Sequence, residues 1–330
     1  MKKITVVVLL LALAYTCVFH SLDAIAKEKD YVFTYYEYNS DTRSEVLKTL
    51  DTSNQTSYSS YEHIYFDTYG NVISRWTPEY NGLNSEAQHN VSSGFRPIAK
   101  TQYESDYTTI QNTTIAPYKY AGYIHYYVGD DPNTGYAIWK NASAFLVGPN
   151  TLVTAGHCCY TTKNGWTEQL YFYPAKDGSS MPYGSAERKS ITVPSAWKND
   201  GNNNYDWGIV TLKTAIGNTT GWFGILTQTS SFVGTNVTMA GYPYTLTNPY
   251  KMHSSSGSVA VCTDYKLYSS YNTYNGASGS PIYTNSTGGN TSIGVHTGYN
   301  SNYGALGVRF TQYFYNLIMQ KNNEYLNSIS

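Results

Sequence analysis

The sequence predicts an all-β fold, an antiparallel sandwich or barrel, over most of its length, followed by one C-terminal helix. From about residue 115, short runs of β-branched and aromatic residues alternate with clusters of Gly, Pro and Asn. No helical pattern separates these runs, and 36 of the 330 residues are tyrosine, a good strand former. The predicted strands are residues 120–128, 144–147, 152–155, 170–174, 208–212, 236–240, 257–262, 280–283, 292–296 and 306–310.

The end of the chain has a helical period instead. Residues 311–326 place Tyr313, Leu317, Ile318 and Tyr325 on one apolar face of a helix. This is the one helix that the pattern predicts clearly.

The N-terminus carries the pattern of a secretory signal peptide. Lys2 and Lys3 precede an apolar run over residues 4–19, and Ala-Ile-Ala at 24–26 fits a cleavage site. The run is shorter than the roughly 20 residues that a membrane-spanning helix needs, which disfavours an uncleaved anchor. We therefore expect residues 1–26 to be removed and the protein to be secreted, with no membrane association afterwards.

Charge and cysteine usage exclude several other classes of protein. Charged residues make up 13% of the chain, against about 25% in an average soluble protein, and the net charge is −1. This balance is unlike the basic stripe of a nucleic-acid binder. After signal cleavage, three cysteines remain, Cys158, Cys159 and Cys262, so at most one disulfide forms within the chain. Pairing of Cys262 with one of the other two stays open.

The sequence predicts neither a cofactor nor a metal. No His or Cys pair has the spacing of a closed zinc site, and neighbours such as His157, Cys158 and Cys159 point apart. Asp130 and Asp131 could in principle bind calcium, but a solvated turn is the better interpretation.

Three motifs carry the chemistry of the chain. Residues 276–281 read Gly-Ala-Ser-Gly-Ser-Pro, residues 154–158 read Thr-Ala-Gly-His-Cys, and residues 205–210 read Tyr-Asp-Trp-Gly-Ile-Val. A serine between glycines also occurs in ordinary loops. All three motifs together, in the order His, Asp, Ser and 49 and 72 residues apart, predict a catalytic triad on different loops of one scaffold.

The residue types fit nucleophilic catalysis. A serine hydroxyl is a weak nucleophile at neutral pH and needs an adjacent base. His157 would take the proton of Ser278 and later deliver it to the leaving amine, while Asp206 would hold the imidazole in the correct tautomer.

These residues resemble the glutamyl endopeptidases, a bacterial branch of the chymotrypsin-like serine proteases. More specific than the triad motifs are the Tyr-Asp-aromatic-Gly form at 205–208, Gly-Tyr-Pro at 241–243 and Ile-Gly-Val-His-Thr at 293–297. The resemblance covers residues 110–320, about two thirds of the chain. It implies two antiparallel six-stranded β-barrels and a C-terminal α-helix.

The resemblance also implies boundaries. Residues 27–100 would be a propeptide and residues 101–330 the protease domain. Within that domain, it places an N-terminal barrel at about 115–220, a C-terminal barrel at about 221–312 and the helix at about 311–326. The stretch 27–100 reads as partly ordered and carries 7 basic and 10 acidic residues.

The resemblance further implies the specificity site. Gly276 and Ser278 would supply the backbone N–H donors of an oxyanion hole, and Gly276 lacks the Cβ that hinders a tight turn. Thr273 and His296 match the family's glutamate pocket, where an imidazolium and a hydroxyl suit a buried carboxylate. Asn272, six before the serine, is uncharged, which disfavours a trypsin-like preference for Lys or Arg.

We therefore expect a secreted, monomeric endopeptidase that cleaves protein or peptide substrates after Glu, and more slowly after Asp. Cleavage after Lys100 would start the mature chain near Thr101, close to a segment that resembles the family's early mature sequence. Two alternatives remain. One is the same triad with another preference, such as large apolar residues, and the other is a catalytically silent binding module on a protease fold.

Overall fold

The computed structural model describes residues 33–50, 63–66, 72–76, 107–244, 250–285 and 290–329, with the backbone alone at 63–66 and 72–76. The expected signal peptide and the expected cleavage site at Lys100 lie outside the described residues. Within the described part, no helix is long and apolar enough to cross a membrane.

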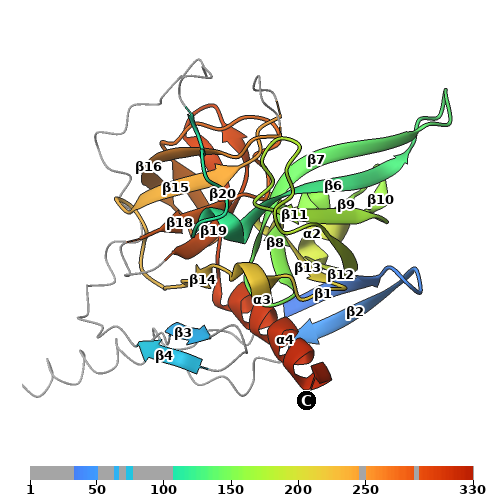
Figure 1. Cartoon of the computed structure of the whole chain (residues 1–330), viewed down its shortest axis with the longest axis horizontal. Helices are drawn as coiled ribbons and strands as arrows, with labels where there is room; N and C mark the ends of the chain where they lie inside the picture. Colours follow the sequence, from blue (N-terminus) through green and yellow to red (C-terminus); the bar gives the residue numbers. More distant parts are fainter. Residues whose placement is uncertain are drawn as a thin grey trace, which may run out of the picture. The chain divides into compact units, whose positions relative to one another are not determined.

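The N-terminal barrel is a closed sheet of six antiparallel strands (Figure 1). The order around it is β11-β6-β7-β8-β13-β12, and pairing of β11 with β12 closes the ring. Its strands are β6 (Ala121–Asp130), β7 (Ala137–Leu146), β8 (Thr151–Thr154), β11 (Leu170–Pro174), β12 (Ala186–Pro194) and β13 (Gly208–Leu212).

The C-terminal barrel is built in the same way. Its order is β18-β15-β16-β17-β20-β19, closed by the pairing of β18 with β19. Its strands are β15 (Asn236–Gly241), β16 (His253–Cys262), β17 (Lys266–Ser269), β18 (Pro281–Thr284), β19 (Thr291–Asn300) and β20 (Gly304–Arg309). Two short strands extend it, because β14 (Gly224–Ile225) pairs with β19 and β5 (Thr108–Thr109) pairs with β16.

Short helices and hairpins join these strands. The helices are η3 (Tyr118–Tyr120), η4 (Gly156–Cys158), α2 (Ser195–Asp200), η5 (Asn203–Tyr205), α3 (Gly217–Thr220) and α4 (Gln312–Ile329). The strands outside the barrels are β1 (Phe33–Asn39), β2 (Ser44–Leu50), β3 (His63–Phe66), β4 (Val72–Trp76), β9 (Tyr160–Thr161) and β10 (Gly165–Trp166).

Alternation of side chains gives each barrel its own core. In β11, Leu170 and Phe172 are buried while Tyr171 and Tyr173 are only partly covered, as expected when successive residues point to opposite faces. Separate clusters of buried apolar side chains fill the two barrels, one around Phe172 and the other around Leu267. The predicted fold class, two six-stranded barrels with a C-terminal helix, is confirmed.

The C-terminal helix extends three residues beyond its predicted end. Leu317 and Ile318 are buried as expected, but Phe314 and Lys321 complete the buried face in place of the predicted Tyr313 and Tyr325. The burial of Lys321 was not predicted, because a lysine is rarely buried without a partner.

The largest departure from the predicted strands lies before the barrels. In the stretch 27–100, residues 34–50 form a hairpin in the same compact unit as the barrels. Its strand β1 pairs antiparallel with β12, so the sheet of the N-terminal barrel continues as β13-β12-β1-β2 (Figure 1). Two barrel strands, β12 and β17, were also missed by the predicted strand set.

Candidate active site

His157 lies in the single turn η4, directly after β8. The extended backbone of Ala155 ends the strand, and the N–H of Cys159 donates to the carbonyl of Gly156, which closes the turn. The imidazole is 32% exposed, so one side faces the protein and the other is open to a substrate.

Asp206 ends a second turn, η5, just before β13. The side chain of Asn202 caps this turn by accepting the N–H of Asn204 at 3.0 Å. The following residue, Trp207, is buried and stacks on Phe314 of α4, with ring centroids 3.8 Å apart. The C-terminal helix therefore holds the backbone on which Asp206 is presented.

The two residues form a close, directed pair. The Nδ1 atom of His157 lies 2.9 Å from Oδ2 and 3.2 Å from Oδ1 of Asp206, and the His157 backbone N–H donates to Oδ1 at 2.8 Å. An ionised carboxylate only accepts hydrogen bonds, so Nδ1 carries a proton and, in the neutral ring, Nε2 is left as the base. Gly156 permits this approach, since a Cβ there would lie 3.0 Å from Oδ1 and 2.8 Å from the Trp207 nitrogen.

Electrostatics set the basicity of this imidazole. Burial, the largest single influence, lowers the pKa of His157, but the charges and hydrogen bonds of Asp206 and Cys158 together outweigh burial. The net result is a pKa well above the ordinary value for histidine. A raised pKa makes His157 a stronger base, and it also means that the ring must lose its second proton before it can act.

Ser278 lies in a tight turn at the border between the barrels. Gly276 and Gly279 have φ angles of +95° and +86°, a region that L side chains rarely adopt. A Cβ on Gly279 would lie 1.9 Å from the Ser143 carbonyl oxygen. The turn is fastened to β7, because the Ser143 N–H donates to the Ser278 carbonyl and the Ser143 hydroxyl donates to the Gly276 carbonyl.

This turn is also tied to β8, the strand that precedes His157. The Thr154 hydroxyl at the end of β8 donates to the Ser143 carbonyl at 2.8 Å. Ser278 itself is half-buried. The N–H of Ala277 donates to Tyr274, whereas those of Gly276 and Ser278 have no hydrogen-bond partner among the described residues.

His296 and Thr273 lie in direct contact next to this turn. The Nε2 atom of His296 is 2.5 Å from the Thr273 hydroxyl, and both side chains are buried. The backbone of His296 is bonded to the turn that carries Ser278, because the Gly279 N–H donates to the His296 carbonyl and the His296 N–H donates to the Ser280 carbonyl. Tyr271 extends the contact between His296 and Thr273, because its hydroxyl lies 3.0 Å from Nδ1 of His296. The sequence prediction missed this residue. Tyr271 lies seven residues before Ser278, and no motif or known spacing in the sequence identifies it as a site residue.

The protonation state of His296 differs from the predicted imidazolium. Burial and, secondarily, the charge of His157 lower the pKa of His296 to about 3. The ring is therefore neutral near pH 7. Nδ1 faces the Tyr271 hydroxyl and Nε2 faces the Thr273 hydroxyl, and a neutral ring donates through one of these nitrogens and accepts through the other.

Lys266 of β17 was not singled out by the sequence. It is buried, and its ammonium donates to the carbonyl of Asn203, in the turn that ends at Asp206. Burial lowers the pKa of Lys266, and the charge of Asp206 opposes this shift. The C-terminal barrel thus contributes one fixed contact to the position of the turn that carries the carboxylate.

Other expectations concern cysteines and metals. Cys158, Cys159 and Cys262 are all free thiols, so the disulfide left open by the sequence is not formed. Asp131 accepts the N–H of Asn133 at 2.8 Å and caps an ordinary turn. Across the described ranges, no group of three or more His, Cys, Asp or Glu residues is arranged to hold a metal ion.

Comparison with known proteins gives consistent matches. The chain matches the trypsin family over residues 127–317, more than half of its length. The glutamyl endopeptidase of Bacillus licheniformis is 38% identical over 229 residues, which cover 66% of this chain and 68% of that protein. The extracellular metalloprotease of Bacillus subtilis is 36% identical over 219 residues, with the same two coverages.

Solved structures agree with the barrels described above. A Glu endopeptidase in complex with MPD matches with a TM-score of 0.57 and 28% identity, covering 66% of this chain and 97% of that one. The protease Anisep from Arthrobacter nicotinovorans, 21% identical with a TM-score of 0.52 over 64% of this chain and 98% of that one, shares the fold. The chain therefore belongs to the trypsin family, as a serine endopeptidase of chymotrypsin-like fold whose substrates are proteins.

Proposed function

We propose that this protein is a secreted endopeptidase that hydrolyses the peptide bond after Glu, and more slowly after Asp, with His157, Asp206 and Ser278 as its catalytic triad. The observation that carries the specificity is the buried His296–Thr273 contact beside the nucleophile turn. The likeness to a glutamyl endopeptidase supports the same choice.

The reaction follows from the proton positions at His157. The Ser278 hydroxyl attacks the scissile carbonyl while Nε2 of His157 takes its proton, and Nδ1 keeps its hydrogen bond to Asp206. The intermediate collapses as His157 gives that proton to the leaving amine. Water then attacks the resulting acyl-enzyme through the same base, which releases the new carboxyl end and restores Ser278.

Two backbone donors would stabilise the charge that develops on the carbonyl oxygen. The N–H groups of Gly276 and Ser278 carry no internal hydrogen bond in the described structure, and each belongs to the nucleophile turn. Removal of one such donor typically lowers the rate by about 100–1,000-fold.

Glu selectivity would rest on a chain of hydroxyl and imidazole donors. In this chain, Tyr271 would donate to Nδ1 of His296, Nε2 of His296 would donate to Thr273, and the Thr273 hydroxyl hydrogen would point to the substrate carboxylate. A carboxylate that enters such a buried site loses water and is favoured only where fixed donors replace it. An apolar side chain of similar size gains nothing from these donors.

The sharpest test of the pocket removes one hydroxyl and keeps the shape of the side chain. Thr273→Val is expected to lower kcat/KM for a peptide with Glu before the scissile bond by about 10–100-fold, because a hydrogen bond to a charged group contributes about 1.5–3 kcal/mol. The matching Leu peptide should change by less than about threefold. Rates on otherwise identical Glu, Asp, Gln, Leu and Lys peptides measure the effect.

The control for this test is Thr238→Val, which makes the same change on β15 at an exposed contact with Ser256. It should leave all five rates unchanged. Equal cleavage of the Glu and Leu peptides by the unaltered protein would overturn the proposed specificity and favour the alternative of a triad with another preference.

Secretion and processing belong to the same proposal. The N-terminal pattern of residues 1–26 and the extracellular relative from Bacillus subtilis support export. Removal of residues 27–100 as a propeptide, by cleavage after Lys100, would then free the protease domain.

A further inference from the structure

The hairpin of residues 34–50, called here the pro-hairpin, covers an edge that the N-terminal barrel leaves open. Strand β12 uses Ala186 and Glu187 to close the barrel against β11. Its remaining half, residues 190–194, pairs antiparallel with β1 over Tyr35–Asn39. Without the pro-hairpin, this half of β12 would expose unpaired backbone donors and acceptors.

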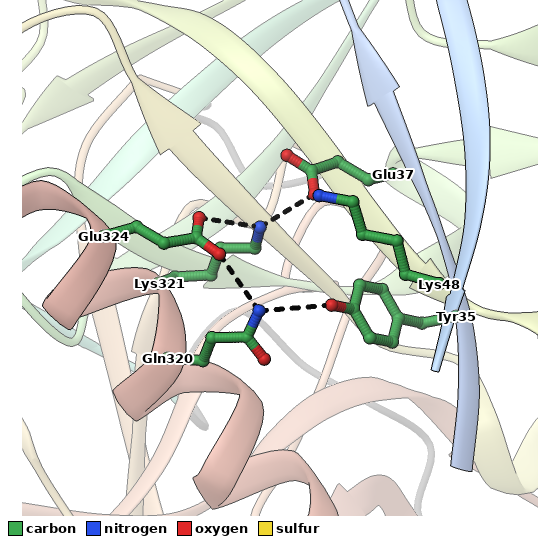
Figure 2. Close-up of polar contacts among 6 residues, drawn as sticks. All are labelled: Tyr35, Glu37, Lys48, Gln320, Lys321 and Glu324. Carbon is green, nitrogen blue, oxygen red and sulfur yellow. Dashed lines mark hydrogen bonds and ion pairs between the residues drawn. The ribbon is translucent and has the colours of Figure 1, made fainter. Parts of the chain in front are cut away.

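Charge complementarity fixes the pro-hairpin to the C-terminal helix. The side chain of Lys321 is 1% exposed, and its ammonium donates to Glu37 at 2.8 Å and to Glu324 at 3.0 Å. Figure 2 shows this cluster, in which Glu37 of β1 also accepts from Lys48 of β2 at 2.6 Å. Loss of such a partner strongly destabilises the folded protein, because it leaves the buried charge of the lysine uncompensated.

Glu37 is ionised in this cluster. Burial alone would raise the pKa of its carboxyl group, but the hydrogen bonds and charges of Lys321 and Lys48 outweigh burial and lower the pKa. The contact between β1 and α4 is therefore a true ion pair at neutral pH. Beside it, the Gln320 side chain donates to the Tyr35 hydroxyl at 3.3 Å.

A second buried cation is covered by an aromatic ring of the pro-hairpin. The Tyr38 ring stacks on Trp166 with centroids 5.2 Å apart and lies 5.3 Å from the guanidinium of Arg188. Arg188 is 1% exposed, and within the described structure its Nε and Nη1 atoms have no hydrogen-bond partner. The face of the Tyr38 ring makes a cation–π contact with this guanidinium, which partly replaces the missing hydrogen bonds.

The pro-hairpin also reaches the border of the active site. Glu45 accepts from the indole of Trp166 at 2.5 Å and from Lys198 at 3.1 Å. Trp166 lines a small cavity of about 20 Å³ together with His157. The pro-hairpin therefore buttresses one wall beside the catalytic histidine.

We propose that the pro-hairpin is a β-strand subunit of the mature enzyme, which stays bound to β12 and α4 after the chain is cut between residues 51 and 106. The inference rests on the proposed cleavage after Lys100, and it replaces full release of residues 27–100 by retention of the pro-hairpin. The protease domain carries the acceptor surface, an open strand edge with the buried cations Lys321 and Arg188. The occupant that matches this surface is this chain's own hairpin, whose Glu37 pairs with Lys321 and whose Tyr38 covers Arg188.

The test makes the cut without relying on the protein's own activity. A recognition sequence for an added site-specific protease is inserted between residues 85 and 100 of the full chain that carries Ser278→Ala. After cutting, gel filtration and mass spectrometry should find the fragment with residues 34–50 together with the protease domain, one to one, until denaturant is added. A fragment that elutes separately under native conditions would overturn the proposal.

This design separates the two proposals, because the cut does not depend on peptidase activity or on natural processing. A second readout needs no further variant. Amide hydrogen exchange over residues 190–193 should be as slow after the cut as before it if β1 still covers this edge. Exchange that rises to the rate of an open edge would contradict retention.

Matched charge removals test the cause of retention. Glu37→Gln should speed release of the fragment at least about tenfold, since it leaves Lys321 with only the half-exposed Glu324. Asp41→Asn makes the same change in the exposed turn of the pro-hairpin, 3.5 Å from Lys213, and should change release less than about twofold. Equal release from the two variants would exclude the buried ion pair as the cause.

Discussion

Ser278→Ala is expected to lower kcat/KM on a Glu peptide by about four or more orders of magnitude. The variant removes the nucleophile, and what remains is the activity that binding and backbone donors give without a covalent step. The loss should lie in kcat, because Ser278 is half-buried and contributes little to substrate binding before the chemical step. Steady-state rates on the purified, processed protein measure it.

The matched control is Ser256→Ala, at an exposed position of β16. It should keep full activity, and both variants should melt within a few degrees of the unaltered protein. Cleavage that survives Ser278→Ala would reject the nucleophile. An unaltered protein that cuts no peptide in any processing state would favour a silent binding module.

Asp206→Asn is the second large effect, with an expected loss of about 10⁴-fold in kcat at neutral pH. An asparagine amide can donate to Nδ1, which favours the tautomer with its proton on Nε2, where the base is needed. The backbone bond from His157 to the side-chain oxygen at 2.8 Å can survive, so the fold should remain intact.

The same variant should move the pH profile in a defined direction. Asp206 raises the pKa of His157 in the folded protein, and catalysis needs the deprotonated ring. Activity therefore rises as pH increases through this pKa. Removal of the carboxylate lowers the pKa, so the rising limb should move to lower pH while the plateau falls.

Asp200→Asn, an exposed carboxylate at the end of α2, is the control for this charge change. It should alter neither the plateau nor the rising limb. A profile of Asp206→Asn that keeps its limb at the original pH would contradict the assignment of His157 as the titrating base.

The sequence predicts most of the barrels because strand residues alternate. Strand β13 lies at the predicted bounds 208–212, and the buried pattern of β11 follows its apolar residues. Strand β12 was missed since its first half, Ala-Glu-Arg-Lys-Ser, is polar although Arg188 within it is buried. A single chain sequence does not reveal that Tyr38, about 150 residues earlier, covers this cation.

The candidate site also contains residues that the sequence predicts and residues that it does not. Motifs point to His157, Asp206 and Ser278, whose chemistry requires those residue types. Tyr271 acts through a contact within the C-terminal barrel and Lys266 through a contact between the two halves of the fold, and neither residue is marked by a motif. Long-range placement therefore explains what the sequence could not predict.

The tyrosine excess is a property of the scaffold. Buried tyrosines occur in both barrels and in the pro-hairpin, where their rings pack, and the hydroxyls of Tyr242 and Tyr271 take part in hydrogen bonds. Tyr123 and Tyr242 meet edge to face with centroids 5.7 Å apart, and Tyr242 donates to the carbonyl of Lys176. Such contacts fill and join the barrels, which is consistent with the low share of charged residues.

Trapping the acyl-enzyme tests the central claim most directly. The active protein is mixed with an activated ester of N-blocked glutamic acid, quenched in acid within the first turnover, digested and analysed by mass spectrometry. We expect one acyl group per molecule, on Ser278, with a burst of the released alcohol of equal size. Turnover with the acyl group on another residue, or with none on Ser278 at any time, would contradict the account.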